Sequence, residues 1–252
     1  MNLRQVIIIA TTALMVAANM LFQQISYFLF GDVPDNYGKY YEAPTLISPK
    51  EFTFIIWAPI FIGMLLFSAY QAFPRNRKSQ LLDSLLWPTI VINIFNGFSL
   101  YAPFGYNILV VVILLIGLGW AFVIIQRFKR TESVSFWFVE FPFTIFFAWI
   151  SVALLVTTSQ TLAYYEWTSF GLPKAAWAAV LVIIATGIGL FITSRYNAFL
   201  YALVLVWAFI GILTTNILLS NWLVASVLII CAVVLLTKIR KVQLVQKQIA
   251  NE

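Results

Sequence analysis

Hydrophobic residues make up 62% of this 252-residue chain and charged residues only 10%, whereas soluble domains are about 45–50% apolar and about 25% charged. A soluble fold of this size could not bury so many apolar side chains, so the sequence predicts an all-α integral membrane protein with the lipid bilayer as its solvent. The chain contains no histidine and a single cysteine. These counts exclude histidine-ligated metal sites, histidine-based catalytic triads and intramolecular disulfides.

Each crossing of a bilayer needs about 20 mostly apolar residues. Eight segments of the chain meet this requirement, and the first is too long for the apolar region of a signal peptide. In chain order they are Val6–Phe30, Phe52–Phe73, Ser84–Phe104, Asn107–Gln126, Phe136–Thr158, Ala175–Thr193, Ala198–Thr215 and Trp222–Thr237.

The basic residues predict how these helices are oriented. With both termini on one side of the membrane, only Lys39, Lys50 and Lys174 of the 15 Lys and Arg residues fall on the other side. Because positive charge collects in cytoplasmic loops, this 12:3 division predicts a multi-pass protein of the cell (cytoplasmic) membrane with both termini in the cytoplasm. The basic residues are scattered over five cytoplasmic segments, which argues against a nucleic-acid partner.

The segment from Gly31 to Lys50 is the longest predicted external loop. Loops longer than about 12–15 residues are often functional or disordered. Two interpretations remain open at this point, an ordinary connector and a lid over a site in the membrane.

Polar side chains inside the apolar segments recur at helical spacing on the first, second, third and fifth segments, which places each set on one helix face. We predict that they line a pocket in the outer half of the membrane, beneath the 31–50 loop. Apolar walls with a few hydrogen-bonding groups are typical of small-molecule sites. The candidate ligand-binding residues are Asn19, Gln23, Trp57, Phe61, Asn93, Asn96, Pro142, Phe143, Trp149 and Ser151.

Two features of these segments have alternative interpretations. Amide side chains such as Asn93 and Asn96 often join membrane helices by hydrogen bonds, so they could be structural rather than ligand-binding. Pro59, Pro88 and Pro142 lie inside the same segments, and a proline within a helix is expected to bend it. Three bent helices would open the bundle around a cavity.

Glu140 is the one acidic residue that we place within an apolar segment, about one turn from its cytoplasmic end. It could reach the membrane surface and pair with Arg127 or Arg130. Otherwise it would take up a proton or pair with a ligand. With no second acid beside it and no metal cluster, no catalytic or metal-binding residue is predicted.

Several of these patterns resemble the TspO/MBR family, which includes tryptophan-rich sensory proteins and the translocator protein. The second segment, FTFIIWAPIFIGMLLFSAYQ, is similar to the family's second helix, with Trp57, Phe61 and Gly63 in the matching positions. IVINIFNGFSLY resembles the third helix through Asn93 and Asn96. PFTIFFAWISVA resembles the fifth helix through Pro142, Phe143, Trp149 and Ala153.

The resemblance covers about residues 5–160 and implies a five-helix ligand-binding bundle, followed from residue 161 by three additional helices and a basic tail. It also implies binding of porphyrins, haem or sterol-like lipids beneath the first loop. We therefore expect a membrane protein that senses or sequesters a flat hydrophobic ligand, with no resident cofactor other than a bound tetrapyrrole. The alternatives are a transporter of such a ligand and a membrane-embedded enzyme of tetrapyrrole or isoprenoid chemistry. The three additional helices are a candidate surface for a homodimer.

Overall fold

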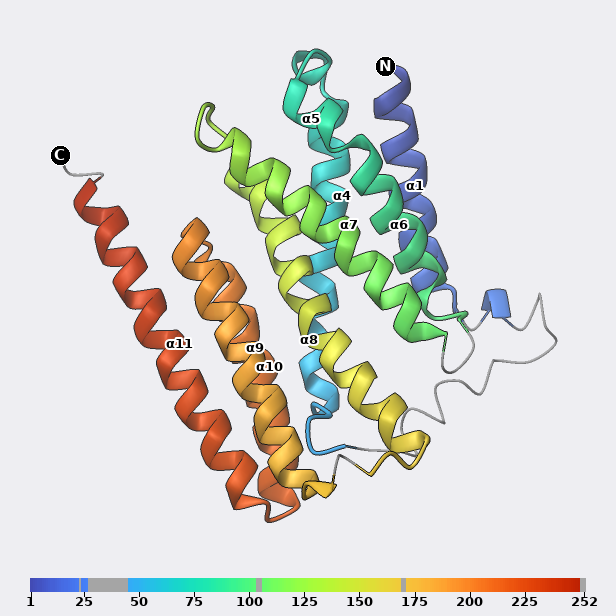
Figure 1. Ribbon diagram of the computed structural model, residues 1–252. Helices are drawn as coiled ribbons and strands as arrows, with labels where there is room; N and C mark the ends of the chain where they lie inside the picture. Colours follow the sequence, from blue (N-terminus) through green and yellow to red (C-terminus); the bar gives the residue numbers. More distant parts are fainter. Residues whose placement is uncertain (23, 27–44, 103–105, 169–170, 250–252) are drawn as a thin grey trace. The chain divides into compact units, whose positions relative to one another are not determined.

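The computed structural model describes residues 1–22, 24–26, 45–102, 106–168 and 171–249, and every regular element in these ranges is helical (Figure 1). Side chains are described as far as residue 244. The helices are α1 Leu3–Met20, η1 Glu51–Ile56, α4 Trp57–Ala72, η2 Pro74–Asn76, α5 Gln80–Ser84, α6 Leu86–Ser99, α7 Asn107–Phe128, η3 Phe136–Glu140, α8 Phe141–Tyr164, α9 Lys174–Tyr196, α10 Phe199–Leu218 and α11 Trp222–Ile249.

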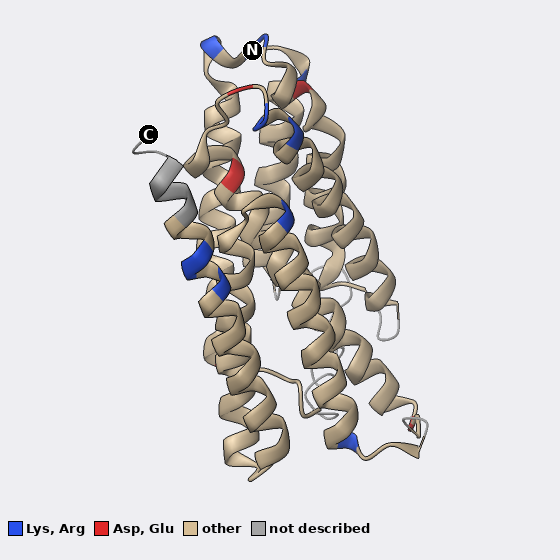
Figure 2. Cartoon of the chain, turned by 60° about the vertical axis from the view of Figure 1, so that its left-hand side comes forward, with Lys and Arg blue, Asp and Glu red and all other residues tan. Residues whose placement is uncertain are grey.

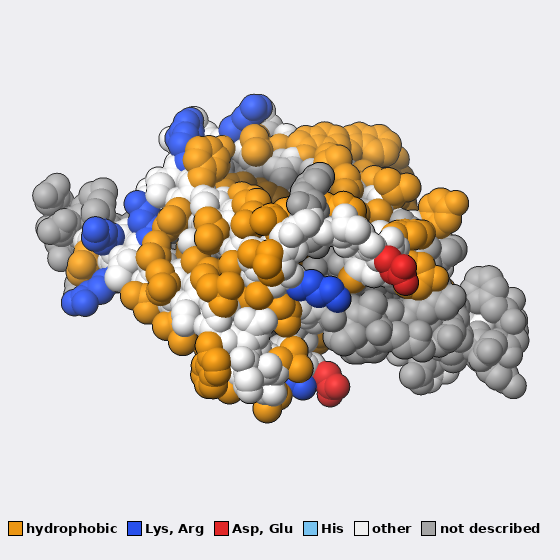
Figure 3. All heavy atoms as spheres, turned by 60° about the horizontal axis from the view of Figure 1, so that its bottom comes forward, with side chains coloured by type: hydrophobic (Ala, Val, Ile, Leu, Met, Phe, Trp, Pro, Cys, Tyr) orange, Lys and Arg blue, Asp and Glu red, His pale blue; other side chains and the backbone are white. Residues whose placement is uncertain are grey.

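The prediction of a helical membrane protein is confirmed. In the described ranges, seven helical stretches are long and apolar enough to cross a membrane. Helix α6 occupies the place of the predicted third segment but has only 14 residues, so eight is an approximate count. Large apolar side chains remain exposed all along these helices, as on Ile116, Phe191 and Leu218, and Figure 3 shows how densely such side chains cover one face.

The three prolines expected to bend helices instead lie where helices begin. Pro59 is the third residue of α4 and follows the 3₁₀-helix η1. Pro88 is the third residue of α6, just after the short helix α5. Pro142 is the second residue of α8 and follows the π-helix η3. The first-turn N–H groups of a helix have no partner within it, so proline loses nothing there. Pro59 and Pro142 therefore mark a change of helix type, whereas Pro88 follows the break between two α-helices.

The chain divides into two compact units, which are described separately. Unit 1 comprises residues 1–42 and 57–150, and unit 2 comprises residues 43–56 and 151–252. In unit 1, α1 packs against α4 and α6, and α6 packs against α7. Gly117 of α7 fits against Val91 and Ile92 of α6, where a Cβ atom would come within 3.1 Å of Val91.

Polar contacts fix the N-terminal end of α1 within unit 1. The guanidinium of Arg4 donates to Asp83 Oδ1 (2.5 Å), to the carbonyl oxygen of Asn76 (2.7 Å) and to that of Ser79 (3.2 Å). Gln5 and Gln71 each donate from the side-chain amide to the other's backbone carbonyl, at 2.9 and 3.1 Å. These bonds set the antiparallel register between α1 and α4.

In unit 2, α10 packs against both α9 and α11, and α9 packs against α11. The segment 45–56 lies along α10, and its contacts run antiparallel to the helix. Three α10 side chains donate to its backbone carbonyls: Asn216 to Leu46 (2.7 Å), Thr215 to Ser48 (2.9 Å) and Trp207 to Thr53 (2.9 Å). The Lys50 N–H donates to the carbonyl oxygen of Gly211 (3.2 Å).

The membrane orientation stays a prediction. The charged residues of unit 1 that the structure describes gather at the end of the bundle that carries the N-terminus (Figure 2), and the positive-inside rule predicts that this end is cytoplasmic. A membrane-impermeant thiol reagent applied to intact cells should label a cysteine introduced at Asn36 but not one introduced at Asn76. Cys231 is buried, so unsubstituted protein is the control for background labelling. The reverse pattern would contradict the orientation.

Candidate ligand-binding site

Four aromatic side chains of α4 and α8 form a cluster in unit 1. Trp57 stacks on Phe61 with ring centroids 5.3 Å apart, and it meets Phe146 and Trp149 edge-on at 5.7 and 6.4 Å. Phe61, Phe146 and Trp149 are buried, whereas Trp57 is half-buried. The Trp57 ring is therefore the partly exposed member of this aromatic cluster, and the other three rings pack against or behind it.

Close packing of α4 against α8 brings the cluster together. A Cβ atom at Gly63 would lie 2.9 Å from the Cβ of Pro142, so glycine is required for this approach. One turn further along α4, Phe67 meets Phe143 edge-on with centroids 4.8 Å apart, and both rings are fully buried. Pro142 and Phe143 thus pack between α4 and α8. They lie nearer than the aromatic cluster to the end of α4 that carries Gln71.

The predicted amide residues lie between α1 and α6. Asn19 Nδ2 donates to Asn96 Oδ1 at 3.1 Å. Asn93 Nδ2 donates to the hydroxyl oxygens of Thr11 and Thr12, both at 3.0 Å. These contacts join the two helices, as the structural interpretation of the asparagines requires. Asn93 Oδ1 and Asn96 Nδ2 are buried and have no partner among the described residues, so each amide keeps one hydrogen-bonding atom unused.

The amide pair and the aromatic cluster lie at a common level of unit 1. Gln5 and Gln71 contact each other and so mark one level of the bundle. Asn19 follows Gln5 by fourteen residues on α1, and Trp57 precedes Gln71 by fourteen residues on α4. At 1.5 Å per residue both distances are about 21 Å, and the two helices are antiparallel neighbours. Asn19, Asn96 and Trp57 therefore lie at the end of the bundle opposite Arg4.

The structure does not test whether two other candidates, Gln23 and Ser151, belong to this site. Gln23 and most of the 31–50 loop lie outside the described residues. Ser151 belongs to unit 2, where its hydroxyl accepts a hydrogen bond from the buried Tyr201 of α10 at 2.8 Å. The spacing of polar residues along the helix had grouped Ser151 with Glu140, but spacing does not show which helix lies opposite each position.

Glu140 forms an ion pair with Lys129 at 2.5 Å, rather than with Arg127 or Arg130 as predicted. It is the last residue of the π-helix η3, and Lys129 lies at the end of α7. Glu140 is buried and the Lys129 side chain is 30% exposed, so the lysine spans the short distance from the carboxylate to the helix end. This ion pair favours the interpretation of Glu140 as an ion-pairing residue, with Lys129 as its partner.

Because Glu140 is already paired with Lys129, we expect Glu140→Gln to leave ligand affinity unchanged. The free energy of unfolding should fall by about 1 kcal/mol, since the pair is only partly buried. Ligand titrations and melting curves on the same samples test both statements. Glu132→Gln, which removes an exposed acid from the connection between α7 and η3, is the control. A loss of affinity in Glu140→Gln alone would show that the carboxylate acts on the ligand.

Sequence reasoning missed Phe146, which completes the aromatic cluster. It lies four residues after Pro142 and three before Trp149, so the helical spacing that selected those two also includes it. The polar contacts of Trp207, Thr215 and Asn216 were missed too, because helical spacing of polar residues was followed only on the first, second, third and fifth segments. Within the described residues, no group of three or more His, Cys, Asp or Glu side chains could hold a metal ion.

Together, these features define a polytopic helical membrane protein with an aromatic cluster between two helices and an amide pair at the same level. The chain belongs to the TSPO-like protein family, whose model matches residues 5–240. The match continues past residue 160 and so includes most of the additional helices. Searches of curated proteins and of solved structures each found no match.

Proposed function

We propose that this protein binds a flat hydrophobic ligand at the Trp57 face of the aromatic cluster and senses or sequesters it. The observation that supports the proposal is the half-buried Trp57 ring, held by Phe61, Phe146 and Trp149 at the level of the Asn19–Asn96 pair. An aromatic surface at the level of the Asn96 amide, which has one unused hydrogen-bonding atom, suits a ligand with a broad apolar face and polar edges.

A porphyrin has this chemistry and is among the ligands that the resemblance to the TspO/MBR family implies, with a sterol-like or isoprenoid ligand as the alternative. The chain has no histidine, so haem iron at this site would have no histidine ligand. A metal-free porphyrin can make the same stacking contacts as haem, because these contacts involve the ring and not the metal. The binding proposal therefore does not depend on iron.

The test is a titration of protoporphyrin into the purified protein, followed by the porphyrin's own absorption. A stacked aromatic ring contributes about 0.5–1.5 kcal/mol beyond the burial of its area, so Trp57→Ala should weaken binding by about tenfold. Trp57→Phe, which keeps a ring, should lose less. Trp149→Ala should act mainly on the melting temperature, because Trp149 is buried behind Trp57.

Trp87→Ala is the matched control, since Trp87 is an exposed tryptophan of α6 in the same unit. Asn93→Leu should lower the melting temperature and leave affinity unchanged if the amide only joins α1 to α6. Equal affinities of unsubstituted protein, Trp57→Ala and Trp87→Ala would mean that the porphyrin binds elsewhere. Protein-dependent accumulation of porphyrin inside sealed vesicles would indicate transport instead of sequestration.

A further inference from the structure

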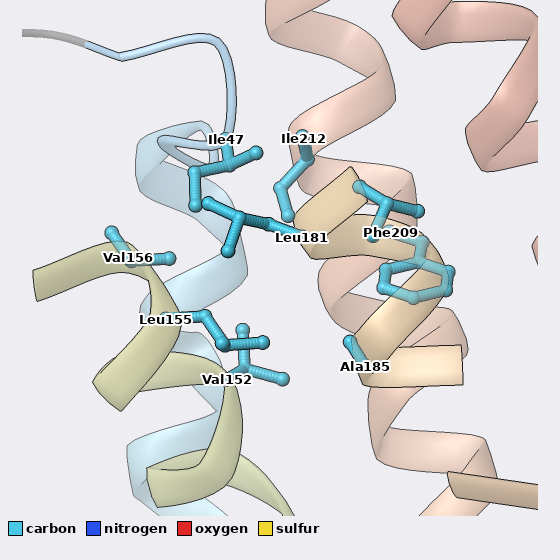
Figure 4. Close-up of a pocket in the computed structure, with 9 residues that line it drawn as sticks. Ile47, Val152, Leu155, Val156, Leu181, Ala185, Phe209 and Ile212 are labelled. Atoms are coloured by element: carbon cyan, nitrogen blue, oxygen red, sulfur yellow. The ribbon is translucent and has the colours of Figure 1, made fainter. Parts of the chain in front are cut away.

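A pocket inside unit 2 is too small for most ligands. It lies between the second half of α8, α9 and α10, and its apolar walls include Leu181, Ala185 and Phe209 (Figure 4). The cavity volume is about 10 Å³, which holds one water-sized group. A larger ligand of unit 2 would not fit there and would have to bind to the outer surface of the helices.

The outer faces of α9 and α11 are apolar, and each continues into a basic residue. On α9, Ile188 and Phe191 are exposed, and Arg195 follows them at helical spacing on the same face. On α11, Val234 is exposed, and Lys241 lies two turns further along the same face. Both faces therefore offer an apolar surface with a positive charge at one end.

The two basic residues lie at the same level of unit 2. Short turns join α9 to α10 and α10 to α11, so α9 and α11 run in the same direction. A Cβ atom at Gly189 would lie 3.3 Å from Cδ2 of Leu235. Arg195 and Lys241 each follow these contacting residues by six positions, or about 9 Å. The Arg195 guanidinium lies 5.5 Å from the centre of the Tyr196 ring, and tyrosine is typical of the headgroup level of a membrane.

Four bases gather at this end of unit 2 without an acidic residue. We call them the basic cluster: Arg195, Lys238, Arg240 and Lys241. The sequence contains no Asp or Glu from residue 174 to residue 251. Glu166 precedes the start of α9, at the opposite end from the cluster, and Glu51 lies beside Lys50, which bonds to Gly211 in the second half of α10. The two ion pairs among the described residues involve other bases. The cluster therefore carries a positive charge that unit 2 leaves unbalanced.

We propose that the basic cluster binds the phosphate headgroup of an anionic phospholipid, whose acyl chains lie along the apolar faces of α9 and α11. Four or more bases that directly follow a membrane helix are typical of anionic-lipid sites. A phospholipid matches both parts of this surface, whereas a soluble anion or an acidic protein would match only the charge. The site lies in unit 2 and is independent of the function proposed for unit 1.

The first experiment varies the ligand. Purified full-length protein in detergent is photolysed with a phosphatidylglycerol that carries a diazirine in one acyl chain, and the modified peptides are identified by mass spectrometry. Adducts are expected on peptides that contain Phe191 or Val234. Unlabelled phosphatidylglycerol should compete about tenfold better than phosphatidylcholine with the same chains, and less so at about 1 M salt.

Three outcomes of this experiment would overturn the proposal. Equal competition by the two phospholipids would show that the basic cluster does not select an anionic headgroup. Effective competition by glycerol 3-phosphate, which has the charge but no acyl chains, would show that a soluble anion binds instead. Adducts that lie only outside unit 2 would place the lipid on another surface.

The second experiment removes the charge. Arg195→Gln combined with Lys241→Gln should reduce the adducts about tenfold. Arg75→Gln combined with Arg77→Gln is the matched control, since it removes the same charge from exposed side chains of unit 1. Undiminished labelling in the first double variant, or an equal loss in both, would overturn the role of the basic cluster. Melting curves check that both variants fold, and if one does not, the competition in the unsubstituted protein decides.

Discussion

Gly211→Ala should lower the free energy of unfolding in detergent by about 2–3 kcal/mol. A Cβ atom at position 211 would collide with both the hydroxyl oxygen and the Cβ of Thr53, and overpacking of this kind typically costs about 1–3 kcal/mol. The Lys50 N–H also donates to the Gly211 carbonyl. Displacement of the segment 45–56 would therefore weaken hydrogen bonds as well, each contributing about 0.5–1.5 kcal/mol.

The same substitution at Gly187 of α9 provides the control, because nothing lies within 4 Å of the position that its Cβ would take. Gly187→Ala should be neutral or slightly stabilising, as alanine favours helix over glycine by up to about 1 kcal/mol. Adding Thr53→Ala to Gly211→Ala should restore part of the lost stability. Identical melting curves for Gly211→Ala and Gly187→Ala would show that the segment 45–56 is not held against α10.

Arg4→Met should cost about 2–3 kcal/mol of unfolding free energy. The guanidinium is buried and donates to a carboxylate and two backbone carbonyls of the segment between α4 and α6. A hydrogen bond to a charged group contributes about 1.5–3 kcal/mol, and bonds made by one group do not add independently. The contribution from Asp83 is at the lower end, because its side chain is 57% exposed. Denaturant titration of the purified protein measures the loss.

Arg77→Met is the matched control, because it removes the same charge from an exposed side chain in the segment that Arg4 binds. It should change stability by less than about 0.5 kcal/mol. Asp83→Asn should fall between the two, since Arg4 would keep both carbonyl partners. A loss in Arg77→Met as large as that in Arg4→Met would mean that the number of positive charges matters, and not the position of the guanidinium.

The membrane-spanning segments could be predicted from the sequence because each requirement is local. A run of apolar residues is sufficient to identify a helix in lipid, and Asn107–Gln126 differs from the observed α7 by only two residues at one end. Bends were predicted at Pro59, Pro88 and Pro142, because an apolar pattern does not show where one helix begins after another. The 3₁₀- and π-helical turns before Pro59 and Pro142 had no signature in the apolar pattern.

The candidate site was predictable only in part, for a related reason. Helical spacing identifies which residues share a face, so Trp57 and Phe61 were correctly placed together on α4. It does not identify the helix opposite, so the bonds from Asn93 to α1 and from Ser151 to α10 required the structure. The segment 45–56 was harder still. Its partners Trp207, Gly211 and Thr215 share one face of α10 at spacings of four residues. The segment itself is an irregular stretch followed by a short 3₁₀-helix, and it has no repeating pattern that would identify this face as its partner.

The contacts between the segment 45–56 and α10 constrain when the protein can finish folding during its synthesis. Asn216 and Leu46 are 170 residues apart in the chain. A ribosome that adds about 5–20 residues per second needs roughly 10–30 seconds to make the intervening chain. Through that interval, the segment that leads into α4 has no α10 to bind. A nascent chain arrested after α9 should therefore keep this segment open to a protease, and protection should begin only once α10 has entered the membrane.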